Sequence, residues 1–324
     1  MLQGAVDGTV MNGTSGKPQA GVPVTLSDIS AMGMQPQGTV KAGAEGKFRF
    51  ELTPAGPALI QAAYQGVTYN LTLQPGSPSS GLTVTIYDSS ARPGAAKVVQ
   101  DIVLLEPAGT QLSVRENIIW QNDGKLTYSD PANGTLRLWV PPEGKSALRV
   151  SVTPPNGLPL EQSASPAAQT NVYKVDFPIK PGETTFEAGY VVPFTNPGSF
   201  SGKSLQKGAP LRLVAPQGVT LKGDGLEFLG QEPKSQASIY GVKSAEYKVD
   251  IQGTAAADAG SSEDEEGGGS GLDEILPRIY DNVYSVVGLA LVILVLGFAL
   301  LYRMHNAPSP SAQAPPVPRS KKPR

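Results

Sequence analysis

Short segments in which apolar and polar residues alternate constrain this chain more than any other feature. In KFRFEL (47–52) the apolar side chains occupy positions 48, 50 and 52, and the charged ones occupy 47, 49 and 51. Successive side chains of a strand point to opposite faces, so this is the pattern of a half-buried β-strand. The 324 residues include 37 Gly and 30 Pro, which interrupt helices and favour turns. The sequence therefore predicts an all-β fold.

The alternating segments fall into two regions. In residues 1–90 they are VPVTLSD, GTVKAG, KFRFEL, ALIQAAY, VTYNLTL and LTVTIYD. They predict an N-terminal antiparallel β-sandwich of about seven strands. Residues 96–252 carry further examples, such as QLSVRENIIWQ (111–121), TLRLWVP (135–141) and TTFEAGYVVP (184–193). These predict a second, larger β-sandwich region, whose length suits either one large sandwich or two smaller ones.

A long apolar run near the C-terminus predicts a membrane anchor. VYSVVGLALVILVLGFALLY (283–302) has no charge over 20 residues, enough for a helix of about 30 Å. Residues 254–282 contain eight acidic groups and one base, whereas residues 303–324 contain five bases and no acid. Positive flanks usually stay in the cytoplasm. We expect a single-pass membrane protein with extracytoplasmic N-terminal domains and a short cytoplasmic tail.

The segments around this run have distinct compositions. Residues 253–271 are small, acidic and Gly-rich, which predicts a flexible linker. Residues 272–282 predict either a short interfacial helix or an extension of the membrane helix. Residues 303–324 form a basic, Pro-rich tail predicted to be disordered. The opening MLQGAVDGTV lacks the basic and apolar parts of a signal peptide, so we expect a removed leader or a natural start further upstream.

Composition excludes several kinds of chemistry. The chain has no cysteine, and its one histidine, His305, lies in the tail. Histidine-dependent triads, thiolate metal sites and His-ligated zinc are therefore excluded from the β regions. The net charge of −2 disfavours nucleic acid as a partner, because phosphate binding needs a concentrated basic surface. We predict no enzyme activity, no metal and no cofactor.

Residues 8–69 resemble the carboxypeptidase regulatory-like domain, which has a carbohydrate-binding-like fold. The resemblance lies in GTVMNGTSGKPQAGVPVTL, GTVKAGAEGKFRFEL and GPALIQAAYQGVTY. The pattern departs from the family in AGAEG (42–46), where Glu45 stands near the usual Asp. Together with YVVPF (190–194), the chain is similar to a bacterial, acidobacterial-type membrane-anchored protein that carries this domain. The resemblance implies an accessory β domain that acts as a spacer, a stabilising partner or a carbohydrate-binding-like module.

Four aromatic residues are candidates for a carbohydrate platform: Tyr64 and Tyr69 beside the QGV turn, and Trp120 and Trp139 in the second region. Sugar sites combine an exposed aromatic face with a few polar groups. Burial in a strand is the alternative for each of them, and the more frequent one for a large aromatic.

Three acidic residues lie close together in residues 113–130, namely Glu116, Asp123 and Asp130. Paired carboxylates can perform acid–base catalysis only when they face each other across a cleft. The NDG of residues 122–124 predicts a hairpin turn instead, because these residues tolerate positive φ.

These patterns favour a non-enzymatic, membrane-anchored envelope protein whose β-sandwich domains bind or scaffold a protein partner. The alternative is a carbohydrate- or peptidoglycan-binding surface module.

Overall fold

The computed structural model describes residues 5–30, 33–52 and 54–255, all within one compact unit that runs from Met1 to Ser261. Its regular elements are β-strands and one short 3-10 helix, η1 (Lys145–Ala147). The all-β prediction is confirmed. No helix in this part of the chain is long and apolar enough to cross a bilayer. The predicted membrane helix (283–302), interfacial helix (272–282) and tail (303–324) lie outside the described residues, as does the linker beyond residue 255.

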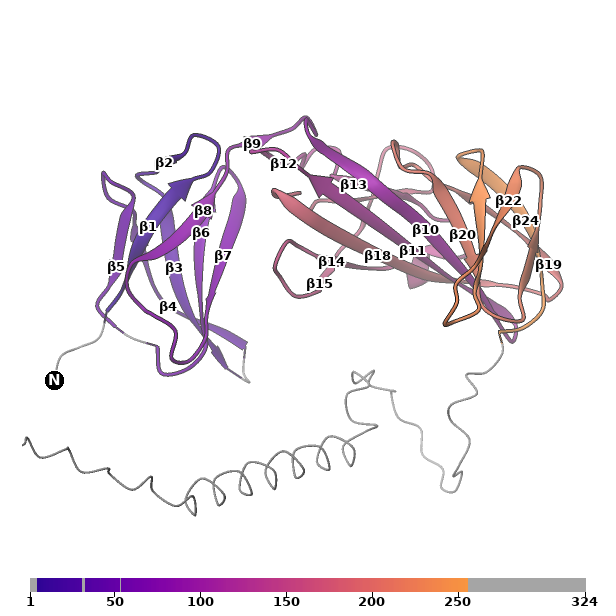
Figure 1. Ribbon diagram of the computed structural model, residues 1–324, viewed down its shortest axis with the longest axis horizontal. Helices are drawn as coiled ribbons and strands as arrows, with labels where there is room; N and C mark the ends of the chain where they lie inside the picture. The colour runs from indigo at the N-terminus through magenta and orange to yellow at the C-terminus, as the bar shows by residue number, and fades with distance from the viewer. Residues whose placement is uncertain (1–4, 31–32, 53, 256–324) are drawn as a thin grey trace, which may run out of the picture. The chain divides into compact units, whose positions relative to one another are not determined.

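The N-terminal region consists of two four-stranded sheets (Figure 1). In the first sheet β1 pairs with β2 and β5 on one edge and with β8 on the other; the second sheet has the order β4–β3–β6–β7. The strands are β1 (Val6–Asn12), β2 (Lys17–Pro18), β3 (Pro23–Ser30), β4 (Gly33–Lys41), β5 (Lys47–Phe50), β6 (Ala58–Tyr64), β7 (Val67–Leu73) and β8 (Leu82–Ile86).

One pairing departs from the predicted antiparallel arrangement. β1 and β8 run parallel, with Gly8 opposite Leu82 and Asn12 opposite Ile86. Apolar alternation determines which face of a strand is buried, but it carries no information about strand direction. The chain crosses from β7 in the second sheet to β8 in the first, where β8 lies alongside β1 and runs in the same direction.

Apolar side chains from both sheets fill the space between them. Phe48 and Phe50 of β5 pack edge to face with their ring centroids 6.2 Å apart, as their alternation predicts. The largest fully buried members of this core are Leu26, Ile60 and Ile86. Buried polar side chains here are limited to Asn12 and Ser27 among the described residues.

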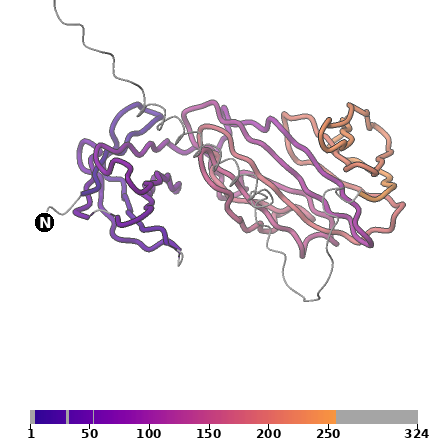
Figure 2. The backbone as a smooth tube through the Cα atoms, turned by 60° about the horizontal axis from the view of Figure 1, so that its bottom comes forward, coloured from indigo at the N-terminus to yellow at the C-terminus, as the bar shows by residue number. Residues whose placement is uncertain are grey.

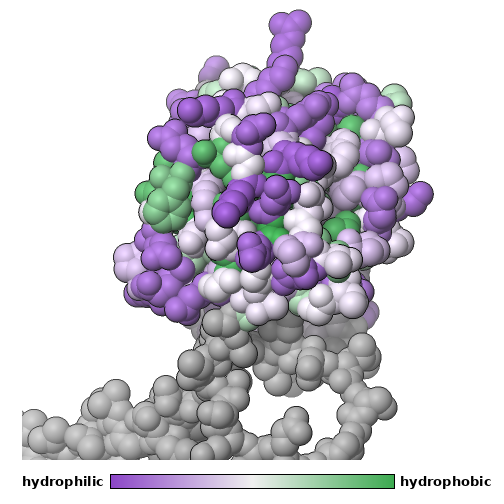
Figure 3. Space-filling view, turned by 90° about the vertical axis from the view of Figure 1, so that its right-hand side faces the viewer, coloured by the Kyte–Doolittle hydropathy of each residue, from purple (hydrophilic) through white to green (hydrophobic). Residues whose placement is uncertain are grey.

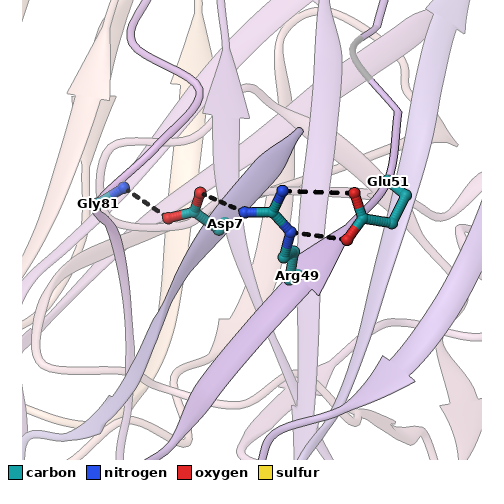
Figure 4. A network of polar contacts seen from close by, with 4 residues as sticks. All are labelled: Asp7, Arg49, Glu51 and Gly81. Carbon is teal, nitrogen blue, oxygen red and sulfur yellow. Dashed lines mark hydrogen bonds and ion pairs between the residues drawn. The ribbon is translucent and has the colours of Figure 1, made fainter. Parts of the chain in front are cut away.

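An exposed polar network supports the outer surface of the first sheet (Figure 4). Arg49 donates to both carboxylate oxygens of Glu51, at 2.7 and 3.3 Å, and its guanidinium lies 3.7 Å from Asp7. Asp7 in turn accepts the backbone N–H of Gly81 at 3.1 Å. The network therefore links β1, β5 and the residue that precedes β8.

The second region is built on an eight-stranded sheet in the order β15–β14–β18–β11–β10–β20–β23–β22. Figure 2 shows its long central strands running alongside one another. The strands are β10 (Ala96–Ala108), β11 (Gln111–Asn122), β14 (Arg149–Thr153), β15 (Leu160–Gln162), β18 (Gly182–Pro193), β20 (Leu211–Ala215), β22 (Leu226–Gln231) and β23 (Ser238–Val242).

Two three-stranded sheets cover the inner face of this large sheet. They are β13–β17–β16 and β19–β24–β21, made of β13 (Leu136–Trp139), β16 (Ser165–Pro166), β17 (Val172–Val175), β19 (Gly198–Lys203), β21 (Thr220–Lys222) and β24 (Glu246–Gln252). Buried residues from all three sheets form one continuous apolar cluster, with Phe186 as its largest fully buried side chain. The region between residues 96 and 252 thus has a single core.

A polar junction connects the two regions. β9 (Ser89–Ser90) pairs in parallel with β12 (Thr127–Tyr128). The Tyr69 hydroxyl lies 2.8 Å from Thr127 Oγ1, and it donates to the carbonyl of Tyr87 at 2.8 Å. Lys180 Nζ donates to the carbonyl of Thr68 at 2.6 Å and lies 5.0 Å from the centre of the Tyr69 ring. Burial lowers the pKa of Lys180 to about 8.

The NDG sequence does not form a hairpin turn. Asn122 ends β11, and the next strand, β12, joins a different sheet. Asn122 is buried; its side chain accepts the N–H of Gly124 and donates to the carbonyls of Leu126 and Ile179. The turn prediction was wrong because buried side-chain hydrogen bonds of Asn122, rather than cross-strand pairing, determine the path of the chain here.

Candidate functional site

The four aromatic residues predicted as a carbohydrate platform lie in different places. Tyr69 is 4% exposed and belongs to the N-terminal core and the junction. Trp120 is 9% exposed and packs against Tyr128, with ring centroids 5.7 Å apart. Tyr64 is half-buried, and its hydroxyl donates to Asp88 at 3.1 Å. Trp139, also half-buried, borders an open cleft.

β13 explains the position of Trp139. Leu136 and Leu138 point into the core, and the alternation turns Arg137 and Trp139 to the other side. The indole borders a cleft of about 320 Å³, which we call the Trp139 cleft. The lining residues are Trp139, Pro141, Pro142, Glu143, Val192, Pro193, Phe194, Ser199, Phe200 and Ser201.

The Trp139 cleft has the composition of a small-molecule site. Ligand sites of about 300–1,000 Å³ are mostly apolar, with a few polar groups that orient the ligand. Here the apolar part is aromatic and proline-rich, and the polar part consists of Glu143 and two serines. One of these hydroxyls is engaged, since Ser199 Oγ donates to Asp250 at 2.6 Å.

A second hollow of about 520 Å³ continues from the Trp139 cleft along β18. The two share Glu143, Val192 and Pro193. Its other side is formed by η1 and by Thr110 and Gln111 at the start of β11. The cleft therefore opens into a longer groove between β18 and the segment that leads into β14.

The three acidic residues singled out in the sequence are not brought together. Asp123 is exposed, 3.6 Å from Lys97. Asp130 accepts hydrogen bonds from Asn133, which lower its pKa. Glu116 is buried in the core of the second region, beside a carboxyl group that sequence spacing did not identify, that of Asp101.

Asp101 and Glu116 form a buried acid pair. They lie on the inner faces of β10 and β11, one diagonal step apart, since Asp101 is opposite Ile118 and Val103 is opposite Glu116. Burial, and secondly the charge of Asp101, raises the pKa of Glu116 well above its usual value. Burial likewise raises the pKa of Asp101, whose Oδ2 accepts the hydroxyl of Ser204 at 2.5 Å. Such a pair can share one proton.

The sequence contains a signal for the buried acid pair, but its meaning can be recognised only once the structure is known. Asp101 stands at an inward position of the run KVVQDIVLLE, in phase with Val103 and Leu105. A charged residue in phase with buried apolar ones indicates a partner inside the core, but the sequence does not identify that partner. Among the described residues, no group of three or more His, Cys, Asp or Glu side chains could hold a metal ion.

Comparisons with known proteins leave the family open. No family model matches the chain, and no curated protein matches it significantly. Among solved structures, an M1 zinc metallopeptidase from Deinococcus radiodurans is similar to it at 12% identity and a TM-score of 0.26, covering 48% of this chain and 42% of the enzyme. A variant of that enzyme bound to a Tyr-Ser-Ala substrate gives 14% identity and a TM-score of 0.26, covering 53% and 50%.

The chain thus spans at most half the length of these two metallopeptidase chains. At such TM-scores the likeness supports neither a shared family nor a shared activity.

Proposed function

We propose that this chain is a non-enzymatic, membrane-anchored envelope protein whose two β-sandwich regions bind a protein partner outside the cytoplasm. The partner-binding part of this proposal rests on one observation. Phe228 and Leu229, on the last strand of the eight-stranded sheet, are 59% and 53% exposed. Figure 3 shows one face of the molecule on which exposed apolar groups lie among mostly hydrophilic side chains.

The local structure of β22 favours contact through side chains. The Phe228 ring packs edge to face on Tyr240, with centroids 5.6 Å apart. A bulge at Leu229 interrupts the ladder with β23 and brings its side chain over Gly241. Bulged edges are poor templates for strand addition. A partner is therefore expected to bury the two apolar side chains, as aromatic anchors do at interface centres.

The anchoring part of the proposal rests on the sequence. The uncharged run 283–302 and the opposite charges of its flanks support one membrane helix with the β regions outside the cytoplasm. The acidic, Gly-rich linker 253–271 would let those regions reach a partner at some distance from the bilayer.

Site-specific photo-cross-linking in native membranes tests the partner. A photoreactive residue at position 228 is expected to give one cross-linked adduct, and Leu229→Ala is expected to weaken it. The matched control is position 34, because Met34 is 56% exposed but lies in the N-terminal region. Equal adducts at both positions, or no adduct at 228, would contradict this interface.

A second candidate function is glycan binding at the Trp139 cleft. It is favoured by the aromatic and proline lining with hydroxyl and carboxylate groups at its border. Trp139→Ala is expected to abolish signals on a glycan array, whereas Phe228→Ala should leave them unchanged. In the cross-linking assay from position 228, Trp139→Ala should leave the protein adduct unchanged whereas Leu229→Ala should weaken it, so the two assays distinguish the two functions.

A further inference from the structure

Two arginines flank a glycine in one row across the outer face of the eight-stranded sheet. Arg115 of β11 and Arg149 of β14 are both opposite Gly189 of β18, on its two sides. Both arginines are exposed, and the inward-facing neighbours of Gly189 are Ala188 and Tyr190. Adjacent strands lie about 4.8 Å apart, so the arginine backbones are roughly 10 Å apart with no side chain between them.

The space over this glycine is open. A Cβ placed on Gly189 would meet only Arg115 Cγ, at 3.8 Å, and the carbonyl oxygen of Val114, at 3.9 Å. A hollow of about 730 Å³ lies here, which we call the Gly189 hollow. Besides the row itself, it is bordered by η1 and by the hydroxyl-bearing Ser113 and Ser146. Neither hydroxyl has a hydrogen-bond partner among the described residues.

The backbone N–H of Val191 lies on the side of β18 away from β11. The N–H of Phe194 bonds to Thr110 at 2.9 Å, so even-numbered residues at this end of β18 direct their polar groups toward β11. Val191 therefore directs its N–H to the opposite side. Pairing with β14 has already ended there, at Gly189 and Arg149. The N–H of Val191, which lines the hollow, therefore points beyond the end of this ladder, toward the side on which η1 lies.

Of the two arginines beside the hollow, only Arg149 has no ion pair with a described residue. Arg115 is held by Glu106 at 3.0 Å. The nearest acid on β18, Glu187, lies one step along the same face, and no ion pair joins it to either arginine. A second acid, Glu143, lines the adjoining hollow.

We propose that the Gly189 hollow is an anion-binding site that takes a carboxylate or phosphate group between Arg115 and Arg149. Guanidinium groups bind such oxyanions through paired, charge-assisted hydrogen bonds. The two serine hydroxyls supply further donors, and the absent side chain of Gly189 leaves the space for the anion.

The hollow continues toward the Trp139 cleft. The intermediate hollow shares Ser146, Ala147 and Val191 with it, and shares Glu143 with the cleft. From Gly189 to Phe194, five residues of extended strand cover roughly 17 Å. An acidic oligosaccharide suits this groove, with one sugar ring at Trp139 and an anionic substituent over Gly189. This assignment of the ligand rests on the glycan-binding candidate, whereas the anion site itself does not.

Titration of the full-length protein in detergent micelles with inorganic phosphate, and separately with acetate, tests the anion site. Phosphate is expected to shift the Val191 amide resonance, and Arg149→Ala should weaken its binding about tenfold or more. Gly189→Val should abolish binding without removing a charge, because its side chain occupies the space between the two arginines. Arg212→Ala is the matched control, an exposed arginine on β20 of the same sheet.

Unchanged phosphate binding in both Arg149→Ala and Gly189→Val, or no shift at Val191, would overturn the site. The two variants act independently, so the test survives if the valine variant does not fold.

The ligand class is tested with a peptidoglycan tetrasaccharide, which carries lactyl carboxylates, against chitotetraose, which lacks them. Preference for the carboxylated sugar that disappears in Gly189→Val supports the assignment. Equal binding of both sugars overturns the acidic-glycan assignment. Phosphate binding without any sugar binding, or tighter binding of an acidic peptide, supports the anion site and overturns the glycan.

Discussion

The two β regions differ in what their cores contain. The N-terminal core is apolar apart from Asn12 and Ser27, and its charged groups lie outside, as in the network around Arg49. The second core encloses the Asp101 and Glu116 carboxyl groups. Buried charges cost free energy unless they are neutralised or paired. The response of this protein to pH should therefore originate in its second region, where the buried carboxyl groups lie.

The largest expected effect is the loss of a central aromatic side chain. Phe186→Ala should destabilise the second region by about 3–5 kcal/mol, because it leaves a cavity in a fully buried site. Both tryptophans, Trp120 and Trp139, lie in this region, so denaturant unfolding followed by their fluorescence measures its stability.

The two cores are separate clusters joined by a small polar junction, so the N-terminal core should keep its hydrogen-exchange protection at Ile60 in this variant. Loss of protection at Ile60 by an equal amount would show that the two regions unfold as one. Leu160→Ala, on the exposed edge strand β15, serves as the control and should change stability by at most about 0.5 kcal/mol.

The next largest loss of stability is expected from a substitution at the polar junction between the two regions. Tyr69→Phe removes the hydroxyl that joins Thr127 and the carbonyl of Tyr87, and should cost about 1–3 kcal/mol because buried polar partners lose their bond. Calorimetry should show the two regions unfolding further apart in temperature. Tyr64→Phe, which removes a half-buried hydroxyl, should change less; a larger loss there than at Tyr69 would contradict the role of the junction.

The acid pair predicts a pH dependence. Burial raises the pKa of Glu116 in the folded state, so the folded protein holds a proton that the unfolded chain releases from about pH 4 upward. Stability from this group is therefore fully present below that pH and is lost as pH rises toward the raised value, by at most about 1.4 kcal/mol per pH unit.

Glu116→Gln should remove this slope while keeping a donor toward Asp101. The difference between wild type and variant, measured by denaturant unfolding at several pH values, isolates the effect. Exposed carboxyls with lowered pKa values, such as Glu51 and Glu246, act in the opposite direction in both proteins and cancel. A difference that is constant across pH would mean that Glu116 does not hold the proton.

The smallest effect is expected on the N-terminal surface. Arg49→Ala removes the bonds to Glu51 and the contact with Asp7, yet all of these groups face solvent, where ion pairs contribute little. The thermal midpoint should stay unchanged in physiological salt. A drop as large as that of Tyr69→Phe would show that this network, rather than the apolar core, holds β8 against β1.

Particular residues show which parts of the fold and of the candidate site could be predicted from the sequence. The alternation of Phe48 and Phe50 placed both side chains in the core, and the strand pattern of residues 184–193 matches β18 within a few residues. The aromatic candidates could not be ranked, because neighbouring strands bury Tyr69 and Trp120 while Trp139 borders a cleft. Whether each aromatic residue is buried depends on which strands, from distant parts of the sequence, become its neighbours in the sheets.

The all-β class and the lack of histidine and cysteine in the β regions follow from the sequence alone, which also predicts a membrane anchor and its orientation. These follow from composition and local periodicity. That Asp101 meets Glu116, that β1 and β8 run parallel, and that Arg115 and Arg149 flank Gly189 became visible only once the strands were placed in their sheets. The physical reason is that sheet register brings together residues far apart in the chain, and alternation carries no information about which strands become neighbours.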